Sequence, residues 1–421
     1  MKLKALVFGL ACLGLISSPA SAKIIHVPAD SSTIQKGING AVNGDTVLVS
    51  PGTFAENINF LGKAITLASH YIIDEHNSTL IDSTVIDGIM LTRHLDSGSV
   101  VTFVSGEDSN SVLTGFTLIG GNGTLRRNTS GGKVERRGGG IYCYGSSPLI
   151  TNNKIMDNHI ASEGVDYEEG GGICCFSSNA RIRNNLILSN SSGQSFGGGI
   201  FLWGSHPDLG KPIIVNNTIV GNDGGGIVVQ GTYPNISNNV ITSNINDGGV
   251  NFISPPGTSI ISYNDVWNNL DNFVNCPPGA GIMDMLNFNR TPCDSFFNII
   301  QNPVFVDSIS NYHLQDSSLC INAGGDLYVE GPDFDLDLNS RKVGCNVDIG
   351  AYEFWYMCGD ANADDEVTVS DVVYLINYLF KDGSPLIPKQ TGDVNCDGDV
   401  TGSDVVYLIY YLFKGGSPPG C

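Results

Sequence analysis

The hydrophobic and polar positions of residues 149–269 recur in five copies of one short phrase. Aligned on their asparagines, the copies share two aliphatic and two asparagine columns. The aliphatic columns are Ile150, Ile182, Ile214, Ile236 and Ile261, and Ile155, Ile187, Ile219, Ile241 and Val266. The asparagine columns are Asn153, Asn185, Asn217, Asn239 and Asn264, and Asn158, Asn190, Asn222, Asn244 and Asn269. This period of 22 to 32 residues, with GGGI phrases between copies, predicts a solenoid of strands.

One turn of such a solenoid cannot bury its apolar face alone, so coils stack at roughly 4.8 Å per rung. The aliphatic columns then fill the interior, and the asparagines hydrogen-bond along the stack. A β-sandwich with coincidental asparagines is the alternative, and four columns in register disfavour it. The pattern resembles the right-handed parallel β-helix repeat of the pectin-lyase-like superfamily. That resemblance implies an all-β, right-handed parallel β-helix.

The flanking segments suggest caps. Apolar positions at Ile34, Ile38 and Val42 predict a short amphipathic helix over 33–42. Residues 32–58 resemble the N-terminal cap of secreted β-helix proteins, and 302–353 resemble the C-terminal cap of exported bacterial ones. We therefore expect a capped β-helix over 23–270 and irregular coils with a cap over 271–356. The acidic run at 333–339 is interpreted as a solvated turn rather than a cation loop.

Residues 358–421 hold two copies of another sequence, 33 positions apart. Each copy has oxygen-bearing side chains at loop positions 1, 3, 5, 9 and 12, and position 7 offers a backbone carbonyl. These residues are Asp360, Asn362, Asp364, Glu366, Thr368 and Asp371 in the first loop, and Asp393, Asn395, Asp397, Asp399, Thr401 and Asp404 in the second. Because Ca²⁺ prefers six to eight hard oxygens, the spacing predicts two Ca²⁺ sites.

An amphipathic pattern follows each loop, so the tail over 357–421 resembles a type I dockerin, a small all-α domain with two calcium loops. The resemblance implies a cohesin module as partner, and loop positions 10 and 11 help to select it. These positions are Val369 with Ser370, and Gly402 with Ser403. Loop position 6 is Gly398 in the second copy but Asp365 in the first, so the first site is expected to be weaker. A calcium-bound end domain without a partner is the alternative.

Composition limits the compartment and the partners. Residues 1–22 have the basic start, apolar run and A-x-A-like end of a secretory signal peptide. Its removal takes two lysines and changes the net charge from −21 to −23, which argues against nucleic acid. No later segment is apolar enough to span a bilayer. We therefore expect a bacterial protein that is secreted or held at the cell surface.

Eleven cysteines include Cys12 in the signal segment. Export permits disulfides, and proximity suggests that Cys276 pairs with Cys293 and that Cys320 pairs with Cys345. Cys143 and Cys175 share a repeat column and are expected to stack inside as small apolar residues. Cys358, Cys396 and Cys421 form an odd set, and their pairing stays open.

Strand alternation after GGGI predicts an outward column of Tyr144, Phe176, Trp203 and Gln230, of which the first three are aromatic. Such rings could support sugar rings, and basic residues in a nearby insert could pair with uronate or sulfate. The basic residues are Arg126, Arg127, Lys133, Arg136 and Arg137. In the alternative, this insert and the acidic one at 161–169 cover the rings and pair with each other.

Two classes of function follow. The first is a polysaccharide-processing or polysaccharide-binding protein, with an anionic glycan as one option, attached to a scaffold through its dockerin. The second is a non-catalytic surface or matrix protein that uses the β-helix as a rigid spacer or adhesin. The catalytic motifs of related lyases and polygalacturonases are not found in the sequence. Catalysis by a polysaccharide lyase or glycoside hydrolase therefore stays open, with no residue assigned to it.

Overall fold

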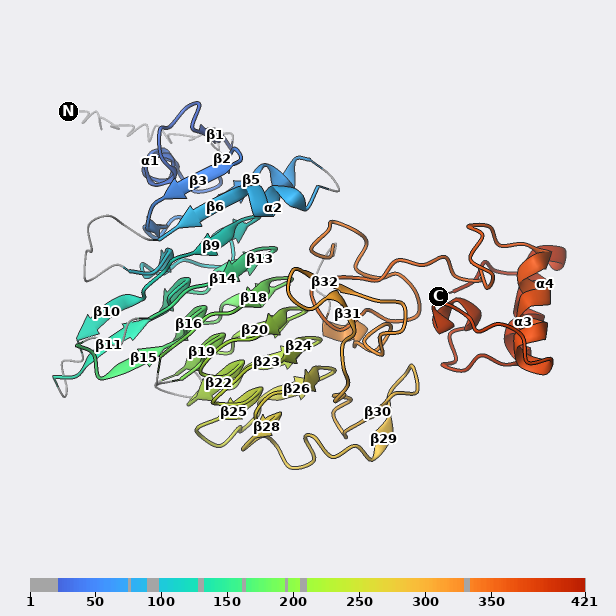
Figure 1. The fold of residues 1–421 in the computed structure, drawn as a ribbon. Helices are drawn as coiled ribbons and strands as arrows, with labels where there is room; N and C mark the ends of the chain where they lie inside the picture. The colour runs from blue at the N-terminus through green and yellow to red at the C-terminus, as the bar shows by residue number, and fades with distance from the viewer. Residues whose placement is uncertain are drawn as a thin grey trace, which may run out of the picture.

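The computed structural model describes residues 22–74, 77–88, 98–127, 132–160, 164–193, 196–204, 210–328 and 334–420. The predicted signal segment lies almost wholly outside these residues. Within them, the chain winds into three parallel sheets, which we call sheets A, B and C. Figure 1 shows the coils stacked from the N-terminal end to the yellow strands, with the C-terminal helices projecting from the side. The predicted solenoid of parallel strands is therefore confirmed.

The strands of each sheet follow one another coil by coil. Sheet A contains β1 (Ile24–Val27), β2 (Thr46–Val49), β5 (Thr66–Ser69), β8 (Val112–Thr114), β13 (Leu149–Thr151), β17 (Arg181–Arg183), β20 (Ile213–Val215), β23 (Asn235–Ser237) and β26 (Ile260–Ser262). Sheet B contains β3 (Gly52–Ala55), β6 (Thr84–Asp87), β9 (Thr117–Ile119), β14 (Lys154–Met156), β18 (Leu186–Leu188), β21 (Thr218–Val220), β24 (Val240–Thr242) and β27 (Asp265–Trp267). Sheet C contains β4 (Ile58–Asn59), β7 (Val101–Phe103), β12 (Ile141–Tyr144), β16 (Ile173–Phe176), β19 (Ile200–Trp203), β22 (Ile227–Gln230), β25 (Val250–Phe252) and β28 (Phe273–Val274).

The aliphatic columns lie in register inside the helix. Ile150 pairs with Ile182 in sheet A, and Ile155 pairs with Ile187 in sheet B. All ten members of the two columns belong to one buried core. The helix α1 (Ile34–Gly40) begins after Thr33, whose hydroxyl caps the Lys36 N–H, and buries Ile34 and Ile38 in the first coil. The predicted N-terminal helix is therefore present at the first coil.

The asparagine columns form two hydrogen-bonded ladders. In the first, the Asn153 backbone N–H and side-chain amide donate to Oδ1 of Asn185, at 3.0 and 3.1 Å. The same pair of bonds repeats down the column to Asn264 and then continues to Asn298, which the sequence pattern did not include. These amides are fully buried, and their bonds satisfy polar groups at the corner between sheets A and B.

In the first ladder, the residue before each asparagine has a left-handed backbone conformation, and the chain turns there from sheet A to sheet B. The residues at this position are Asn152, Asn184, Asn216, Asn238 and Tyr263, with φ between 52° and 56°. Asparagine tolerates this conformation better than most residues. Because the first ladder uses the second asparagine of each pair, the side chain of the first is left to contact another segment.

That other segment is 302–356, which runs back along the helix instead of closing its end. The Asn152 amide donates to the Asp335 carbonyl, the Asn184 amide donates to the Phe334 carbonyl, and Asn238 exchanges two bonds with Gly325. The segment contains β31 (Phe305–Asp307), β32 (Asn311–Leu314) and η2 (Asp326–Tyr328). We call this segment, 302–356, the strap. Its apolar residues pack on the outer face of sheet B, so it lies along the side of the β-helix and not over its end as the sequence suggested.

The acidic run also differs from expectation. Asp335 is fully buried and accepts the N–H groups of Asp337, Asn339 and Glu353, each at 2.9 Å. The run is thus a turn, as interpreted, but its central carboxylate is not solvated. Asp333 lies outside the described residues.

Both disulfides predicted from proximity in the sequence, Cys276–Cys293 and Cys320–Cys345, are wrong. Cys276, Cys293 and Cys320 are free, and Cys345 is bonded to Cys396 in the C-terminal domain. Cys358 is disulfide-bonded as well, and Cys421 lies outside the described residues. Proximity in the sequence gave the wrong partner for Cys345, because the strap brings this residue next to the C-terminal domain. Cys143 and Cys175 are free, buried and opposite each other in β12 and β16, as predicted.

The other helices and strands are short or peripheral. They are η1 (His70–Ile72), α2 (Thr79–Ser83), β10 (Thr124–Arg127), β11 (Val134–Arg137), β15 (Tyr167–Glu169), β29 (Met285–Leu286), β30 (Pro292–Cys293), α3 (Val369–Phe380), η3 (Lys389–Gly392) and α4 (Gly402–Lys414). No helix in the described ranges has the length and apolar character needed to cross a membrane.

Candidate calcium-binding and glycan-binding sites

The first calcium loop brings its predicted carboxylates together. Asp360, Asp364 and Asp371 each offer an oxygen within 4.8 Å of the other two. The backbone folds around them, since Asp360 accepts the N–H groups of Asp364 and Asp365 at 3.0 and 2.9 Å. The Asn362 Oδ1 atom is buried without a hydrogen-bond partner. Converging carboxylates and an unpartnered amide oxygen are the donors that Ca²⁺ prefers, so these residues fit the ion.

The second loop repeats these backbone hydrogen bonds, although its described carboxylates do not converge within 4.8 Å as those of the first loop do. Asp393 accepts the N–H groups of Asp397 and Gly398 at 3.0 and 2.9 Å, and Asp404 accepts that of Thr401 at 2.8 Å. Burial, followed by the charges of Asp404 and Asp397, raises the pKa of Asp393. A cation would offset this crowding of negative charge.

Each loop also starts its helix. Thr368 and Asp371 form a capping box at the start of α3, and Thr401 and Asp404 form one at the start of α4. The last predicted ligand of each loop therefore satisfies a backbone N–H of the helix terminus. The inner faces of the helices pack around Leu375 and Leu408, which are fully buried. A calcium ion bound in either loop would be held by groups that the helix terminus already orients.

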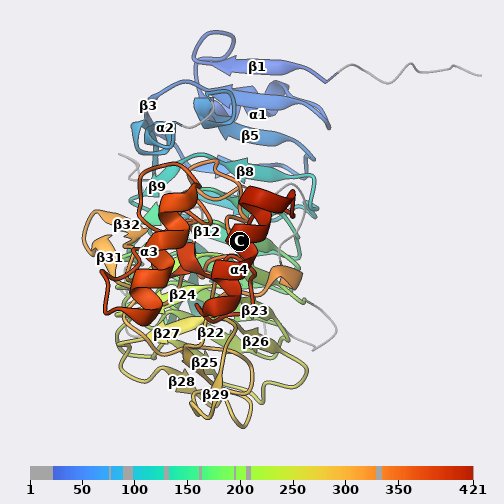
Figure 2. The ribbon, with the colours of Figure 1, turned by 90° about the vertical axis from the view of Figure 1, so that its right-hand side faces the viewer.

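The predicted cohesin-recognition residues lie on the outer surface. Val369, Ser370, Gly402 and Ser403 are all exposed at the helix starts. Large apolar side chains on the same two helices are also exposed, among them Val373, Phe380, Val406, Tyr410 and Phe413. Figure 2 shows both helices on the side facing away from the β-helix.

Two family models match the chain, one in the C-terminal domain and one in the β-helix. The model of the type I dockerin domain matches residues 358–413, and the model of the right handed beta helix region matches residues 71–254. The chain thus consists of a right-handed β-helix followed by a C-terminal type I dockerin domain, as the sequence resemblances implied.

Three solved structures are similar at low identity. Pectate lyase Pel9A has a TM-score of 0.40 and 13% identity, covering 79% of this chain and 97% of that one. A pectin methylesterase in complex with a hexasaccharide has a TM-score of 0.25 and 13% identity, covering 57% of this chain and 68% of that one. The pectin methylesterase from Aspergillus niger has a TM-score of 0.25 and 11% identity, covering 62% and 88%. None of the curated proteins compared with the chain matches it.

The three rings of the predicted column on sheet C are in contact, and we call them the ring stack, although Phe176 and Trp203 meet edge to face. The Tyr144 and Phe176 ring centroids are 5.1 Å apart, and those of Phe176 and Trp203 are 4.1 Å apart. The Arg126 guanidinium lies 5.3 Å from the Tyr144 ring, and that of Arg137 lies 4.8 Å from both Phe176 and Trp203. The structure therefore brings together five of the seven predicted glycan-contact residues.

The two inserts cover the base of this ring stack. Strands β10 and β11 pair in antiparallel fashion, and β15 adds to them in parallel. Arg137 is buried and makes ion pairs with Glu135 and Glu169, at 2.6 and 2.7 Å. Arg136 is buried and donates to the Gly123 carbonyl, whereas Arg127 is exposed. The alternative that the inserts pair with each other is thus confirmed, and the Arg137 charge is neutralised locally.

Not all of the ring stack is covered. Tyr144 is 44% exposed, and Phe176 and Trp203 are half-buried. The neighbouring outward residues Tyr142 and Phe201 are fully buried beneath the inserts. A narrow aromatic edge, flanked by Arg126, therefore stays open to solvent.

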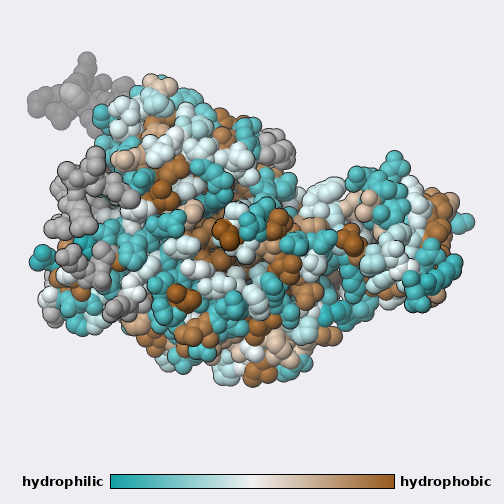
Figure 3. All heavy atoms as spheres, in the orientation of Figure 1, coloured by the Kyte–Doolittle hydropathy of each residue, from teal (hydrophilic) through white to brown (hydrophobic). Residues whose placement is uncertain are grey.

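The sequence did not reveal a cleft that lies between sheet B and the strap. It has a volume of about 760 Å³ and is lined by Trp267, Thr242 and Ser243 from the coils and by Asp307, Tyr312 and Gln315 from the strap. Asp307 is its one charged side chain among the described lining residues. Figure 3 views this face of the molecule, where apolar side chains gather near its centre. No periodic signal marks this cleft, because half of it comes from the non-repeating strap.

Proposed function

We propose that this protein is a secreted, polysaccharide-binding or polysaccharide-processing β-helix protein that attaches to a scaffold or cell surface through a calcium-dependent dockerin–cohesin contact. The observation that carries the proposal is the dockerin domain, with converging oxygens in its first loop and exposed recognition positions on both helices. A large apolar surface exposed by a small domain marks an interaction site.

Attachment is tested by binding the full chain to a panel of immobilised cohesin modules, with Ca²⁺ or with a chelator. We expect binding only with Ca²⁺, because site formation and loop folding are coupled. The double variant Asp371→Asn/Asp404→Asn should lose binding, whereas Lys23→Ala, on the first coil, should not. Equal binding with and without Ca²⁺ would contradict the proposal.

For glycan binding, the open aromatic edge at Tyr144 and the cleft at Trp267 are the two candidate surfaces. The first has the Arg126 cation beside the rings, which favours uronate or sulfate groups. The second has a carboxylate and several hydroxyls and amides, which favour a neutral sugar chain. An aromatic platform with polar groups at its rim is a frequent sugar-binding arrangement.

Affinity electrophoresis of the full chain in pectin, alginate, glycosaminoglycans and neutral glucans would separate the two surfaces. Trp203→Ala should weaken retention by an anionic glycan and Trp267→Ala by a neutral one, each by roughly tenfold. The same mixtures are monitored for unsaturated uronate absorbance, which reports a lyase, and for reducing ends, which report a hydrolase. Retention that neither variant changes would remove both surfaces from consideration.

The second candidate function is a rigid, non-catalytic spacer at the cell surface. The ion pairs of Arg137 with Glu135 and Glu169 favour it, since they neutralise a cation that could otherwise contact an anionic glycan. Absence of any glycan retention or product, together with calcium-dependent cohesin binding, would select this function.

A further inference from the structure

The two calcium loops have the same backbone plan but different surroundings. In the first loop, positions 4, 6 and 7 are Ala363, Asp365 and Glu366, and all three are exposed. In the second loop, the same positions are Cys396, Gly398 and Asp399. Gly398 is buried and the other two are half-buried. The β-helix side of the molecule therefore covers one loop and not the other.

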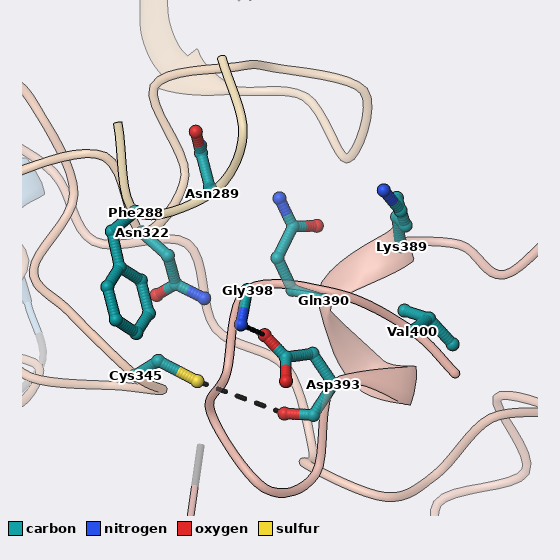
Figure 4. A pocket seen from close by; sticks show the side chains of 9 residues that line it. All are labelled: Phe288, Asn289, Asn322, Cys345, Lys389, Gln390, Asp393, Gly398 and Val400. Atoms are coloured by element: carbon teal, nitrogen blue, oxygen red, sulfur yellow. Dashed lines mark hydrogen bonds between the residues drawn. The ribbon is translucent and has the colours of Figure 1, made fainter. Parts of the chain in front are cut away.

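Three contacts produce this cover. Cys396 is bonded to Cys345 of the strap, and the Asp399 Oδ2 atom lies 2.6 Å from the Arg290 Nη2 atom. A Cβ atom on Gly398 would lie 2.4 Å from the Phe288 carbonyl oxygen. Figure 4 shows Phe288 and Cys345 on one side of the junction and Asp393 and Gly398 on the other. The space left between them is a cavity of only about 30 Å³.

Glycine at position 6 is explained by this contact rather than by the turn alone. Asp365 occupies the same position of the first loop with a φ of 66°, and Gly398 has a φ of 87°. A residue with a side chain is therefore compatible with the loop conformation, because aspartate tolerates the left-handed region. Asp365 is exposed, whereas a Cβ atom on Gly398 would lie 2.4 Å from the Phe288 carbonyl oxygen, so the glycine permits the close approach to Phe288.

We propose that the second calcium loop is also the joint that fixes the dockerin to the β-helix, with Phe288, Arg290 and Cys345 as positioning residues for that loop. The Arg290 contact uses the Asp399 side chain, so the backbone carbonyl predicted as the position 7 ligand is not consumed by it. The disulfide restricts the loop before metal arrives, and a pre-ordered loop binds with less loss of entropy. The joint holds the recognition helices in one orientation, facing away from the β-helix (Figure 2).

The joint is tested by small-angle X-ray scattering of the full chain, with and without Ca²⁺. Gly398→Asp places in the second loop the residue that the first loop carries, and Cys345→Ser/Cys396→Ala removes the disulfide and leaves the alanine of the first loop. Both should increase the radius of gyration and the maximum dimension, because the dockerin is released. The matched control Asp365→Gly alters the uncovered loop and should leave the scattering curve unchanged.

Scattering curves of both released variants that equal the wild-type curve would overturn the joint. The far-UV circular dichroism of each variant must match the wild type, and a variant that fails this check is replaced by Arg290→Ala, which removes a side chain that is 47% exposed.

The effect of the disulfide on the calcium affinity of the second loop rests on the proposed calcium binding. It is measured by calorimetric titration of the full chain with Ca²⁺. We expect two unequal sites, and Cys345→Ser/Cys396→Ala should weaken one site by roughly tenfold while leaving the other unchanged. Equal weakening of both sites, or of neither, would overturn this effect. A wild-type chain that binds no Ca²⁺ would overturn the proposed attachment and this effect together, whereas the scattering result decides the joint independently.

Discussion

The β-helix and the dockerin are both built from sequence repeats, but they use the repeats differently. In the β-helix, each copy satisfies the next, so that Asn185 accepts hydrogen bonds from Asn153 and donates to Asn217. In the dockerin, each copy satisfies itself, since Asp371 accepts the N–H of Thr368 within the same loop. The first arrangement spreads stability over many coils, and the second concentrates it in two small loops.

The two regions also differ in the groups that are left unsatisfied within a single repeat. A coil without neighbours has unpaired strand edges and an uncovered core. The first dockerin loop has clustered carboxylates and a buried Asn362 oxygen with no hydrogen-bond partner in the protein. The β-helix should therefore be sensitive to changes in its interior, and the dockerin should be sensitive to its ligand.

Calcium removal should give the largest separation between the two regions. Each site adds about 4 kcal/mol when free Ca²⁺ exceeds its Kd a thousandfold, so a chelator should unfold the helices and leave the β-helix folded. Hydrogen exchange followed by mass spectrometry would locate the change in 358–420. Protection in that segment that is unchanged by the chelator would contradict the calcium assignment.

The next largest effect should come from a single ladder residue. Asn217→Ala removes the acceptor of the Asn185 N–H and amide and the donor to the Ile182 carbonyl. Buried polar groups left unpaired cost about 1–3 kcal/mol each, so the unfolding midpoint in guanidinium should fall markedly. Asn110→Ala, at an exposed turn, is the control and should leave the midpoint unchanged. Equal midpoints for the two variants would show that the ladder adds little.

The parts that sequence predicted are those in which a residue contacts its own counterpart. The aliphatic and asparagine columns repeat, so alignment of the copies gave their register directly. Asn298 joins the first ladder without belonging to a recognisable copy, and for that reason the alignment missed it. The convergence of Asp360, Asp364 and Asp371 was predictable in the same way, because the loop is local and its pattern occurs twice.

The parts that sequence could not predict depend on non-repeating contacts. The strap binds to the first asparagine of the pairs at Asn152, Asn184 and Asn238, and nothing in the strap repeats with the coils. The bond between Cys345 and Cys396 joins two regions that sequence had treated as separate domains. Gly398 looked like a turn requirement, and its contact with the Phe288 carbonyl became visible only in three dimensions.

A smaller effect concerns the pH dependence of the stability of the β-helix. Asp265 is buried where the strap meets β27, and burial raises the pKa of its carboxyl to about 7. Between the unfolded pKa near 3.8 and about 7, the folded state holds a proton that the unfolded state has released. The free energy of unfolding should therefore fall as pH rises through this window, at no more than about 1.4 kcal/mol per pH unit.

Asp265→Asn should remove this contribution and leave a shallower pH dependence of β-helix stability. Urea unfolding at pH 5 and pH 8, followed by circular dichroism in the β-sheet region, measures the slope. If the variant and the wild type lose the same stability between these pH values, the buried carboxyl is not the cause.

The smallest predicted effect is a difference in stability between the helix caps of the two calcium loops. Thr368 and Thr401 cap α3 and α4, each accepting a backbone N–H at 3.2 Å. Replacing either threonine by alanine should cost about 1 kcal/mol of local stability. The second loop is also held by Cys345 and Arg290, so its helix has less freedom to lose its first turn. Thr368→Ala should therefore lower the thermal midpoint of the dockerin more than Thr401→Ala. Equal shifts, measured by circular dichroism at low Ca²⁺, would mean that the covered loop gains no stability from its contacts with the β-helix side.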